Sequence, residues 1–177
     1  MLEPADLLEI HRRTHSGTIT LLEHCAQFGS EELHRRFEGF GYPSIHHQLH
    51  HIIEAEDYWI GVLRGEFAPG GRHFERASRT EEVDESLNFP ALADLAAYRE
   101  RVAMDTGAFL DQQSAAQLAT PGEYSVWGGK AVTLTPALVV LRPIMHTFHH
   151  RGQAAVMCRI LGYPVPPSTA LDFPLRP

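Results

Sequence analysis

The sequence predicts an all-α protein, a four-helix bundle with a small β-hairpin before its last helix. Two observations predict it. Apolar residues recur at three- and four-residue spacing in four long segments, and capping or helix-stopping residues bound those segments. Each segment has roughly 20–28 residues and would span about 30–40 Å, a length typical of such bundles.

The first two helices are expected over residues 3–28 and 44–64. Ser44 is a candidate N-cap for the second helix, because its hydroxyl can accept a hydrogen bond from the first turn. Gly65 then favours the end of that helix. Residues 65–90 show no strong period, so we expect a crossover connection there, with room for short helical turns.

The third helix, the hairpin and the fourth helix are expected over residues 91–118, 124–134 and 135–161. Two short strands around a Gly-Gly turn predict the hairpin, and a Thr-Pro pair is a typical start for the last helix. The tail, residues 164–177, holds five prolines and is expected to be extended.

The connections predict how the helices run. A long crossover lets the second and third helices lie parallel, while the shorter links favour antiparallel neighbours, which gives an up-down-down-up order. The length of 177 residues suits one domain, and we expect residues 1–177 to form it.

Charge and cysteine content exclude some classes of function. A net charge of −7 and a pI near 5.9 would repel a phosphate backbone, so no nucleic-acid partner is expected. No segment has the length or apolarity of a membrane span or a signal peptide. Cys25 and Cys158 lie in helical patterns without a C-x-x-C motif, which indicates reduced core thiols and a cytoplasmic location.

A pair of histidines in the last helix has the spacing of metal ligands. His146 and His150 are four residues apart, so their side chains share one helix face. Two imidazoles placed in this way can bind one ion, as they do in H-E-x-x-H sites. The glutamate of that motif is missing here, so the zincin pattern does not apply and a third ligand must come from elsewhere.

The second helix contains four candidates for that third ligand. On a helical wheel, His46 and His50 lie opposite the apolar stripe, as does Asp57, and these are expected to face solvent. His51 lies on a flank of the apolar arc, whereas His47 is nearer the solvent edge. His51 is therefore the better candidate, although a chain with 12 histidines also forms such groupings by coincidence.

These residues carry a resemblance to a known family. The chain resembles the DinB/YfiT-like family of metal-binding four-helix-bundle proteins (the DinB superfamily) over nearly its whole length. The most specific segment runs from His146 to Gln153, where His150 is followed by Arg-Gly-Gln, and in a second segment Trp59 follows His51 by eight residues. The resemblance implies that the family's three metal-binding histidines correspond to His51, His146 and His150.

The resemblance also implies a chemistry. Characterised relatives include thiol-dependent transferases and isomerases in which the metal activates a low-molecular-weight thiol. We therefore expect a metal-dependent enzyme that activates a thiol or water nucleophile, such as a thiol-dependent S-transferase. The alternatives are a metal-dependent hydrolase of a small ester or amide, and a non-catalytic, metal-stabilised dimeric bundle. The expected metal is zinc or nickel, with iron or manganese as alternatives, and the expected partners are a small-molecule substrate and a second copy of the chain.

Two residues near the expected ligands have more than one interpretation. Glu56 lies near the centre of an apolar arc, where an unpaired carboxylate is costly. It would either orient a ligand imidazole or belong to a buried pair. Gln153, one turn beyond His150, would hydrogen-bond a metal-bound water or substrate, or simply pack.

Other neighbours are also left open by the sequence. His149 is a rival to His150, but it would lose the four-residue spacing from His146, so His150 is preferred. Tyr58 on the His51 flank could reach a pocket or belong to the core. Trp127 on the hairpin could cover the site or pack against the bundle. Two arginines, Arg142 and Arg151, could receive an anionic substrate or lie on the surface.

Overall fold

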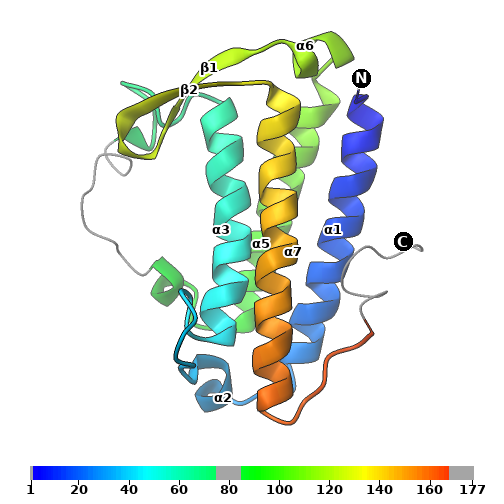
Figure 1. Cartoon of the computed structure of the whole chain (residues 1–177), viewed down its shortest axis with the longest axis vertical. Coiled ribbons are helices and arrows are strands. Elements are labelled where there is room, and N and C mark those ends of the chain that lie inside the picture. The colour runs from blue at the N-terminus through cyan, green and yellow to red at the C-terminus, as the bar shows by residue number, and fades with distance from the viewer. Residues whose placement is uncertain (1, 75–84, 168–177) are drawn as a thin grey trace.

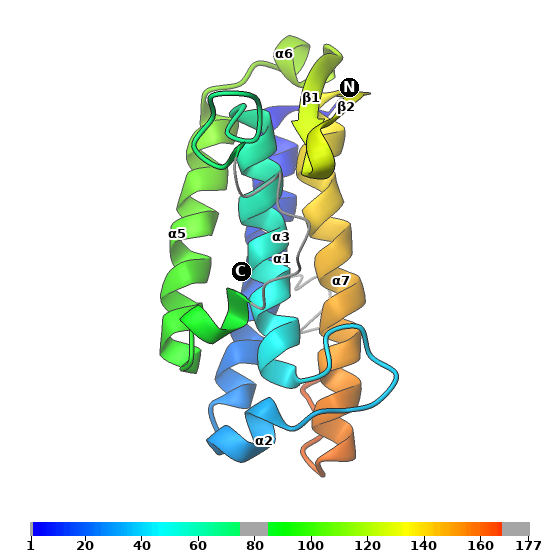
Figure 2. The same cartoon turned by 90° about the vertical axis from the view of Figure 1, so that its left-hand side faces the viewer.

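Four long helices form the body of the protein in the computed structural model, which describes residues 2–74 and 85–167 (Figure 1). They are α1 (Pro4–Cys25), α3 (Ile45–Leu63), α5 (Leu92–Asp111) and α7 (Pro136–Ile160). Helices α3 and α5 run parallel to each other and antiparallel to α1 and α7, as Figures 1 and 2 show. The predicted all-α bundle and its up-down-down-up order are confirmed.

Local signals in the sequence set the starts of two of these helices. The Ser44 hydroxyl accepts a hydrogen bond of 3.1 Å from the backbone N–H of His47. The Thr135 hydroxyl accepts one of 3.4 Å from Leu138, and proline occupies the first turn of α7. Each cap satisfies a backbone donor that has no partner inside the helix.

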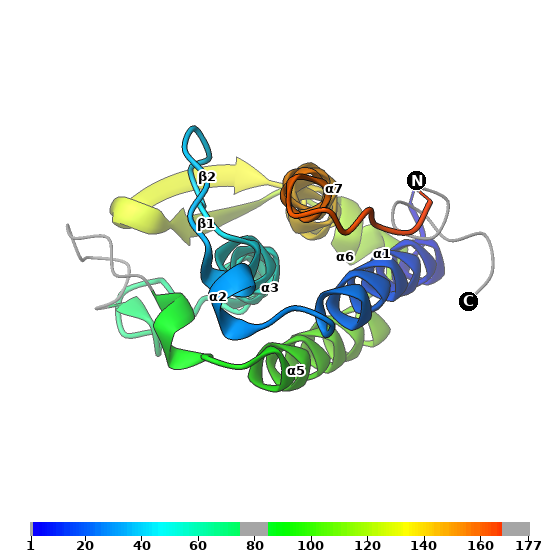
Figure 3. The ribbon, with the colours of Figure 1, turned by 90° about the horizontal axis from the view of Figure 1, so that it is seen from below.

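The hairpin lies where the sequence predicts it, before the last helix. Strands β1 (Gly122–Val126) and β2 (Lys130–Leu134) pair antiparallel, and a single 3₁₀ turn, η2 (Trp127–Gly129), joins them. Gly128 and Gly129 have φ values of 76° and 68°, a region that favours glycine. Seen along the bundle axis, the hairpin lies outside α3 and α7 (Figure 3).

The third helix is shorter than predicted. Helix α5 ends at Asp111 instead of continuing to residue 118, and the short helix α6 (Ala115–Ala119) follows. Ser114 begins α6 with a capping box, accepting a hydrogen bond from the Gln117 backbone while the Gln117 side chain bonds back. The connections hold two more short elements, α2 (Ser30–His34) and η1 (Glu85–Asn88).

The core fills the space between the four helices. Helix α3 contacts α5 and α7, and α1 contacts the same two helices, so α1 and α3 lie diagonally opposite each other in the bundle (Figure 3). Cys25 and Cys158 are buried in it, as expected. Among the described residues, no helix combines the length and apolarity needed to cross a bilayer. Most of the predicted extended tail, residues 168–177, lies outside the described part of the chain.

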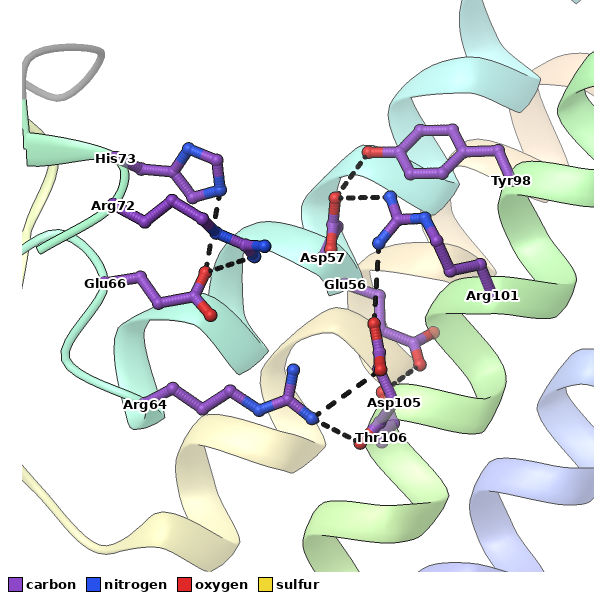
Figure 4. Close-up of polar contacts among 10 residues, drawn as sticks. All are labelled: Glu56, Asp57, Arg64, Glu66, Arg72, His73, Tyr98, Arg101, Asp105 and Thr106. Atoms are coloured by element: carbon purple, nitrogen blue, oxygen red, sulfur yellow. Dashed lines mark hydrogen bonds and ion pairs between the residues drawn. The ribbon is translucent and has the colours of Figure 1, made fainter.

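The expectation that His46 and His50 face solvent is wrong. Both are buried, with only 2% of their surface exposed. The segment before α5 covers this face of α3: His46 Nε2 donates a hydrogen bond of 2.6 Å to the Phe89 carbonyl, and the His50 ring lies 5.3 Å from the Phe89 ring. Asp57 is also partly covered, because Tyr98 and Arg101 of α5 hydrogen-bond to it (Figure 4).

Candidate metal centre

Three histidines from two helices meet between α3 and α7. His51 comes from α3, and His146 and His150 come from successive turns of α7. One nitrogen from each ring lies within 4.8 Å of the others. The Nε2 atoms of His51 and His146 are 2.8 Å apart. The structure therefore brings together the three residues that the sequence singled out.

The protonation of His150 follows from its hydrogen bonds. Its Nδ1 lies 2.7 Å from Oε1 of Gln48, a residue with no exposed surface. The Gln48 amide has a defined orientation, because its Nε2 donates to the Tyr42 carbonyl at 2.6 Å and a carbonyl can only accept. His150 Nδ1 must therefore donate to Oε1, which leaves Nε2 of the neutral ring with a free lone pair. This is the state that binds a metal.

Burial keeps the α7 imidazoles neutral. Desolvation is the main cause that lowers the pKa of His146 to about 4 and that of His150 to about 3, with the neighbouring imidazoles adding to the effect. Near neutral pH these side chains therefore offer lone pairs without first having to release a proton, which favours metal binding.

The donor set fits a divalent ion. Nε2 atoms bound to one tetrahedral ion would lie about 3.3 Å apart, so the observed 2.8 Å needs to open by only a few tenths of an ångström. The other nitrogen of His51, Nδ1, is buried without a hydrogen-bond partner in the described part of the chain, 3.7 Å from Oε2 of Glu54. A ligand imidazole normally donates from this second nitrogen, and Glu54 is near enough to accept after a small movement.

A cavity of about 390 Å³ adjoins two of the three histidines. Its lining combines aromatic, charged and ligand side chains from α3, the hairpin and α7: His51, Glu54, Ala55, Tyr58, Trp59, Val126, Trp127, Arg142 and His146. The volume suits a small molecule, which would have direct access to an ion bound by the imidazoles. Three protein ligands with an open side are the pattern of catalytic rather than structural metal sites.

Tyr58 and Trp127 both line this cavity and are linked to each other. The backbone N–H of Trp127 donates a hydrogen bond of 2.7 Å to the Tyr58 hydroxyl, which attaches the hairpin to α3. Burial raises the pKa of Tyr58, although this hydrogen bond and the charge of Arg142 oppose the rise. Tyr58 therefore shapes the cavity in its protonated form.

The two arginines have different environments. Arg142 lines the cavity, and its guanidinium lies 4.8 Å from the centre of the Trp59 ring. Arg151, in contrast, is 2% exposed and donates a hydrogen bond of 2.9 Å to the Thr14 carbonyl. It faces α1 and links two helices, so the expectation that it could receive a substrate is wrong.

Gln153 and His149 form the outer part of the His150 network. Gln153 Oε1 accepts a hydrogen bond of 2.8 Å from Gln48, and its Nε2 lies 2.8 Å from Nε2 of His149. Gln153 thus supports the amide that orients His150, a role that differs from both sequence interpretations. His149 is an exposed residue at the end of this network.

Glu56 belongs to a different cluster. His11 and His15 of α1 place Nε2 atoms 2.7 and 2.8 Å from its two oxygens, and Thr106 of α5 donates a hydrogen bond of 2.6 Å (Figure 4 shows the Thr106 contact). Burial alone would raise the pKa of Glu56, but the electrostatic attraction and the hydrogen bonds of the two imidazole N–H groups lower it well below its ordinary range. Glu56 is a buried carboxylate paired with α1, and its partners are not the three converging histidines.

The ligand atoms of this second cluster are spaced as in a metal site, but the imidazole nitrogens that face its centre carry protons. The ligand atoms of His11, His15 and Glu56 also lie within 4.8 Å of one another. However, Arg99 approaches Nδ1 of His15 at 3.2 Å, and a guanidinium can only donate. Neutral His15 therefore carries its proton on Nε2, where it bonds to Glu56. That proton occupies the position a metal ion would need, so the cluster is a hydrogen-bonded network.

Sequence reasoning missed two residues around the first cluster. Gln48 is not predicted as part of the site, although it lies one turn before His51 on the same helix. Tyr42 lies in a loop, yet its ring stacks on His51 with centroids 3.7 Å apart. A buried glutamine at this spacing is a usable signal, whereas the loop tyrosine leaves none in the helical pattern.

Comparison with known proteins identifies the family. The model of the DinB family matches residues 1–175. The chain belongs to the DinB family. A DinB-like protein from Bacillus cereus has a similar structure, with a TM-score of 0.59 and 17% identity over 89% of this chain and 94% of that one. A DinB-like protein from Bacillus subtilis gives a TM-score of 0.52 and 17% identity over 89% and 95% of the two chains.

At this identity the two structures show the DinB fold, and that fold agrees with the predicted bundle. No curated protein matches the chain. The resemblance inferred from the sequence is therefore confirmed at the level of the family.

Proposed function

We propose that this DinB-family protein is a metal-dependent enzyme that transfers a low-molecular-weight thiol to an electrophilic small molecule. One divalent ion, zinc or nickel, would be held by Nε2 of His51, His146 and His150. The observation that carries the proposal is the Gln48 hydrogen bond to His150, because it holds that imidazole in its metal-binding tautomer, while the other two histidines line an accessible cavity. When bound, the ion would lower the pKa of a thiol and so supply a thiolate near neutral pH.

The charges of the cavity support a thiol that carries a carboxylate. Arg142 is held over Trp59 at the cavity wall, and a guanidinium binds carboxylates in a planar, two-pronged geometry. Trp59 and Trp127 offer flat apolar surfaces for the electrophile. Arg142 would thus position the thiol, while the tryptophans would exclude water from the reacting sulfur.

Hydrolysis of an ester or amide is the second candidate. It needs a general base near the attacking water, such as a carboxylate or an imidazole that does not bind the metal. Glu56 is held by His11, His15 and Thr106, and His149 is exposed and bonded to Gln153. Glu54 is the carboxylate in the cavity lining, but it lies beside Nδ1 of His51, where it would orient a ligand. These positions favour thiol transfer.

Metal binding is tested first with zinc and nickel titrations of metal-free protein, followed by calorimetry. We expect one ion per chain, lost in His51→Ala and His150→Ala. His47→Ala on the same helix and His149→Ala on the same turn are matched controls and should bind normally. Equal binding by His51→Ala would show that the assigned ligand set is wrong.

Activity is then tested with several thiols and the generic electrophile monochlorobimane. We expect turnover that requires the metal, and a raised KM in Arg142→Met for thiols with a carboxylate but not for 2-mercaptoethanol. Turnover that persists after chelation would eliminate the mechanism. Cleavage of p-nitrophenyl acetate without any thiol, faster than thiol transfer, would favour the hydrolase.

A further inference from the structure

A second cavity, of about 420 Å³, opens between α1 and α5. Its lining shares no residue with the cavity beside the three histidines. Apolar side chains from both helices form its walls, among them Leu8, Ile19, Ala103 and Met104. A space of this size matches the pockets that hold small organic molecules.

The polar side of this cavity is built from buried groups. His11 and His15 line it and are only 5% and 9% exposed. Both imidazoles use Nε2 to contact the buried Glu56 carboxylate, at 2.7 and 2.8 Å. Because that carboxylate accepts from both rings and from Thr106, the two histidines are held in one orientation beside the cavity.

Among the arginines of this lining, Arg99 has the partner that a ligand would most easily replace, although the Glu100 and Glu56 carboxylates also favour its charged form. The other two arginines in the lining, Arg12 and Arg13, are both ion-paired with Glu9. Arg99 instead directs one guanidinium nitrogen at the neutral His15 ring, 3.2 Å away. That contact is weaker than a charged pair, so an anion entering the cavity would gain a charged hydrogen-bond donor, in competition with the Glu100 carboxylate of the same lining.

We infer that this cavity is a second ligand site, which takes a small organic carboxylate with an apolar body. The carboxylate would bind the Arg99 guanidinium in a two-pronged manner, and the apolar body would lie against Leu8, Ile19 and Met104. A bare metal ion does not fit the site, because His15 carries a proton on the nitrogen that faces Glu56. This inference is independent of the metal centre and of its proposed chemistry.

The test is binding of octanoate to the metal-free protein, measured by calorimetry. Octylammonium and octanol, with the same chain and a positive or neutral head, are the ligand controls. We expect octanoate alone to bind, with its dissociation constant raised about tenfold or more in Arg99→Met, since a charge-assisted hydrogen bond is lost. Arg101→Met is the matched control, because Arg101 lies on the same helix but outside the cavity lining and pairs with Asp57.

A second variant fills the cavity without touching its charges. Gly107 lines the cavity, and a Cβ placed there meets no atom within 4 Å. Gly107→Leu should therefore fold and should abolish octanoate binding. The inference is overturned if octanoate fails to bind, if octylammonium binds equally well, or if binding survives both Arg99→Met and Gly107→Leu. It is also overturned if binding is lost in Arg142→Met instead, because that result would place octanoate in the cavity beside the three histidines.

Discussion

Gln48 offers the sharpest test of how the protein prepares its metal ligands. The side chain has no exposed surface and makes three hydrogen bonds: to the His150 ring, to the Tyr42 carbonyl and to Gln153. Gln48→Met keeps the length of the side chain and removes all three. His150 can then place its proton on either nitrogen, so part of the population presents N–H to the metal instead of a lone pair.

Both the metal affinity and the stability should change. Loss of a group that orients a ligand imidazole typically weakens metal binding about 10- to 100-fold, which is about 1.4–2.7 kcal/mol. Removing the hydrogen bonds of this fully buried amide should lower the free energy of unfolding by about 1–3 kcal/mol. Zinc affinity is measured by competition with a chromophoric chelator, and stability by urea unfolding of the metal-free protein.

A matched variant separates the two effects. Gln153→Met removes the contacts of Gln153 with Gln48, His149 and the edge of the His150 ring, and leaves the bond between Gln48 and His150 in place. We expect its zinc affinity to change far less than that of Gln48→Met. If folded Gln48→Met binds zinc as tightly as the wild type, or Gln153→Met is equally impaired, the amide does not set the state of His150.

Three further results are expected. Chelation of the metal should lower the melting temperature, because an ion at 100 times its dissociation constant contributes about 2.7 kcal/mol, and unchanged melting would argue against a bound metal. Below pH 6.5 the metal-free protein should lose stability, because the imidazoles take up protons there in the unfolded chain, whereas in the folded protein their pKa values are about 4 for His146 and about 3 for His150. Urea unfolding at pH 7, 6 and 5 measures this loss. His146→Ala should make the stability depend less on pH. Glu56→Gln should cost about 1.5–3 kcal/mol in urea unfolding, because two buried imidazoles lose their hydrogen bonds to a charged carboxylate, yet zinc should still bind at one ion per chain.

The parts of the fold that depend on local patterns could be predicted from the sequence. Helical periodicity and the Ser44 and Thr135 caps indicated α3 and α7, and the four-residue spacing placed His146 and His150 on one face. These signals are local, because a helix start or a shared face depends on residues within about one turn. His51 could be selected because its side of the helix follows from the same periodicity.

The parts that depend on distant contacts could not be predicted. His46 and His50 occupy the side of α3 that a helical wheel assigns to solvent, and they are buried because distant residues, Phe89, His34 and Tyr98, pack against them. The charge of Glu56 required a partner, but its partners His11 and His15 lie more than 40 residues away on α1. Periodicity within one helix contains no information about which other helix faces it.

The two histidine clusters show what decides between a metal site and a hydrogen-bond network. In each, two imidazoles four residues apart on one helix face a third group from α3. The two clusters differ in the residue that contacts the ring nitrogen facing away from the cluster, which is Nδ1 in both His150 and His15. Gln48 presents an acceptor to His150, which leaves a lone pair directed at the other imidazoles. Arg99 presents a donor to His15, which forces a proton onto the nitrogen directed at Glu56.

This difference predicts the metal content of the protein. The wild type should bind one zinc ion per chain, and His11→Ala should still bind one, whereas His51→Ala should bind none. Arg99→Gln replaces the donor beside His15 with an amide whose oxygen can accept, so His15 can move its proton to Nδ1 and free Nε2. A second, weaker equivalent of zinc should then appear in titrations of Arg99→Gln and disappear again when His15→Ala is added. A wild-type protein that binds two ions, one of which survives in His51→Ala but not in His15→Ala, would show that the residue at the second nitrogen does not control the site.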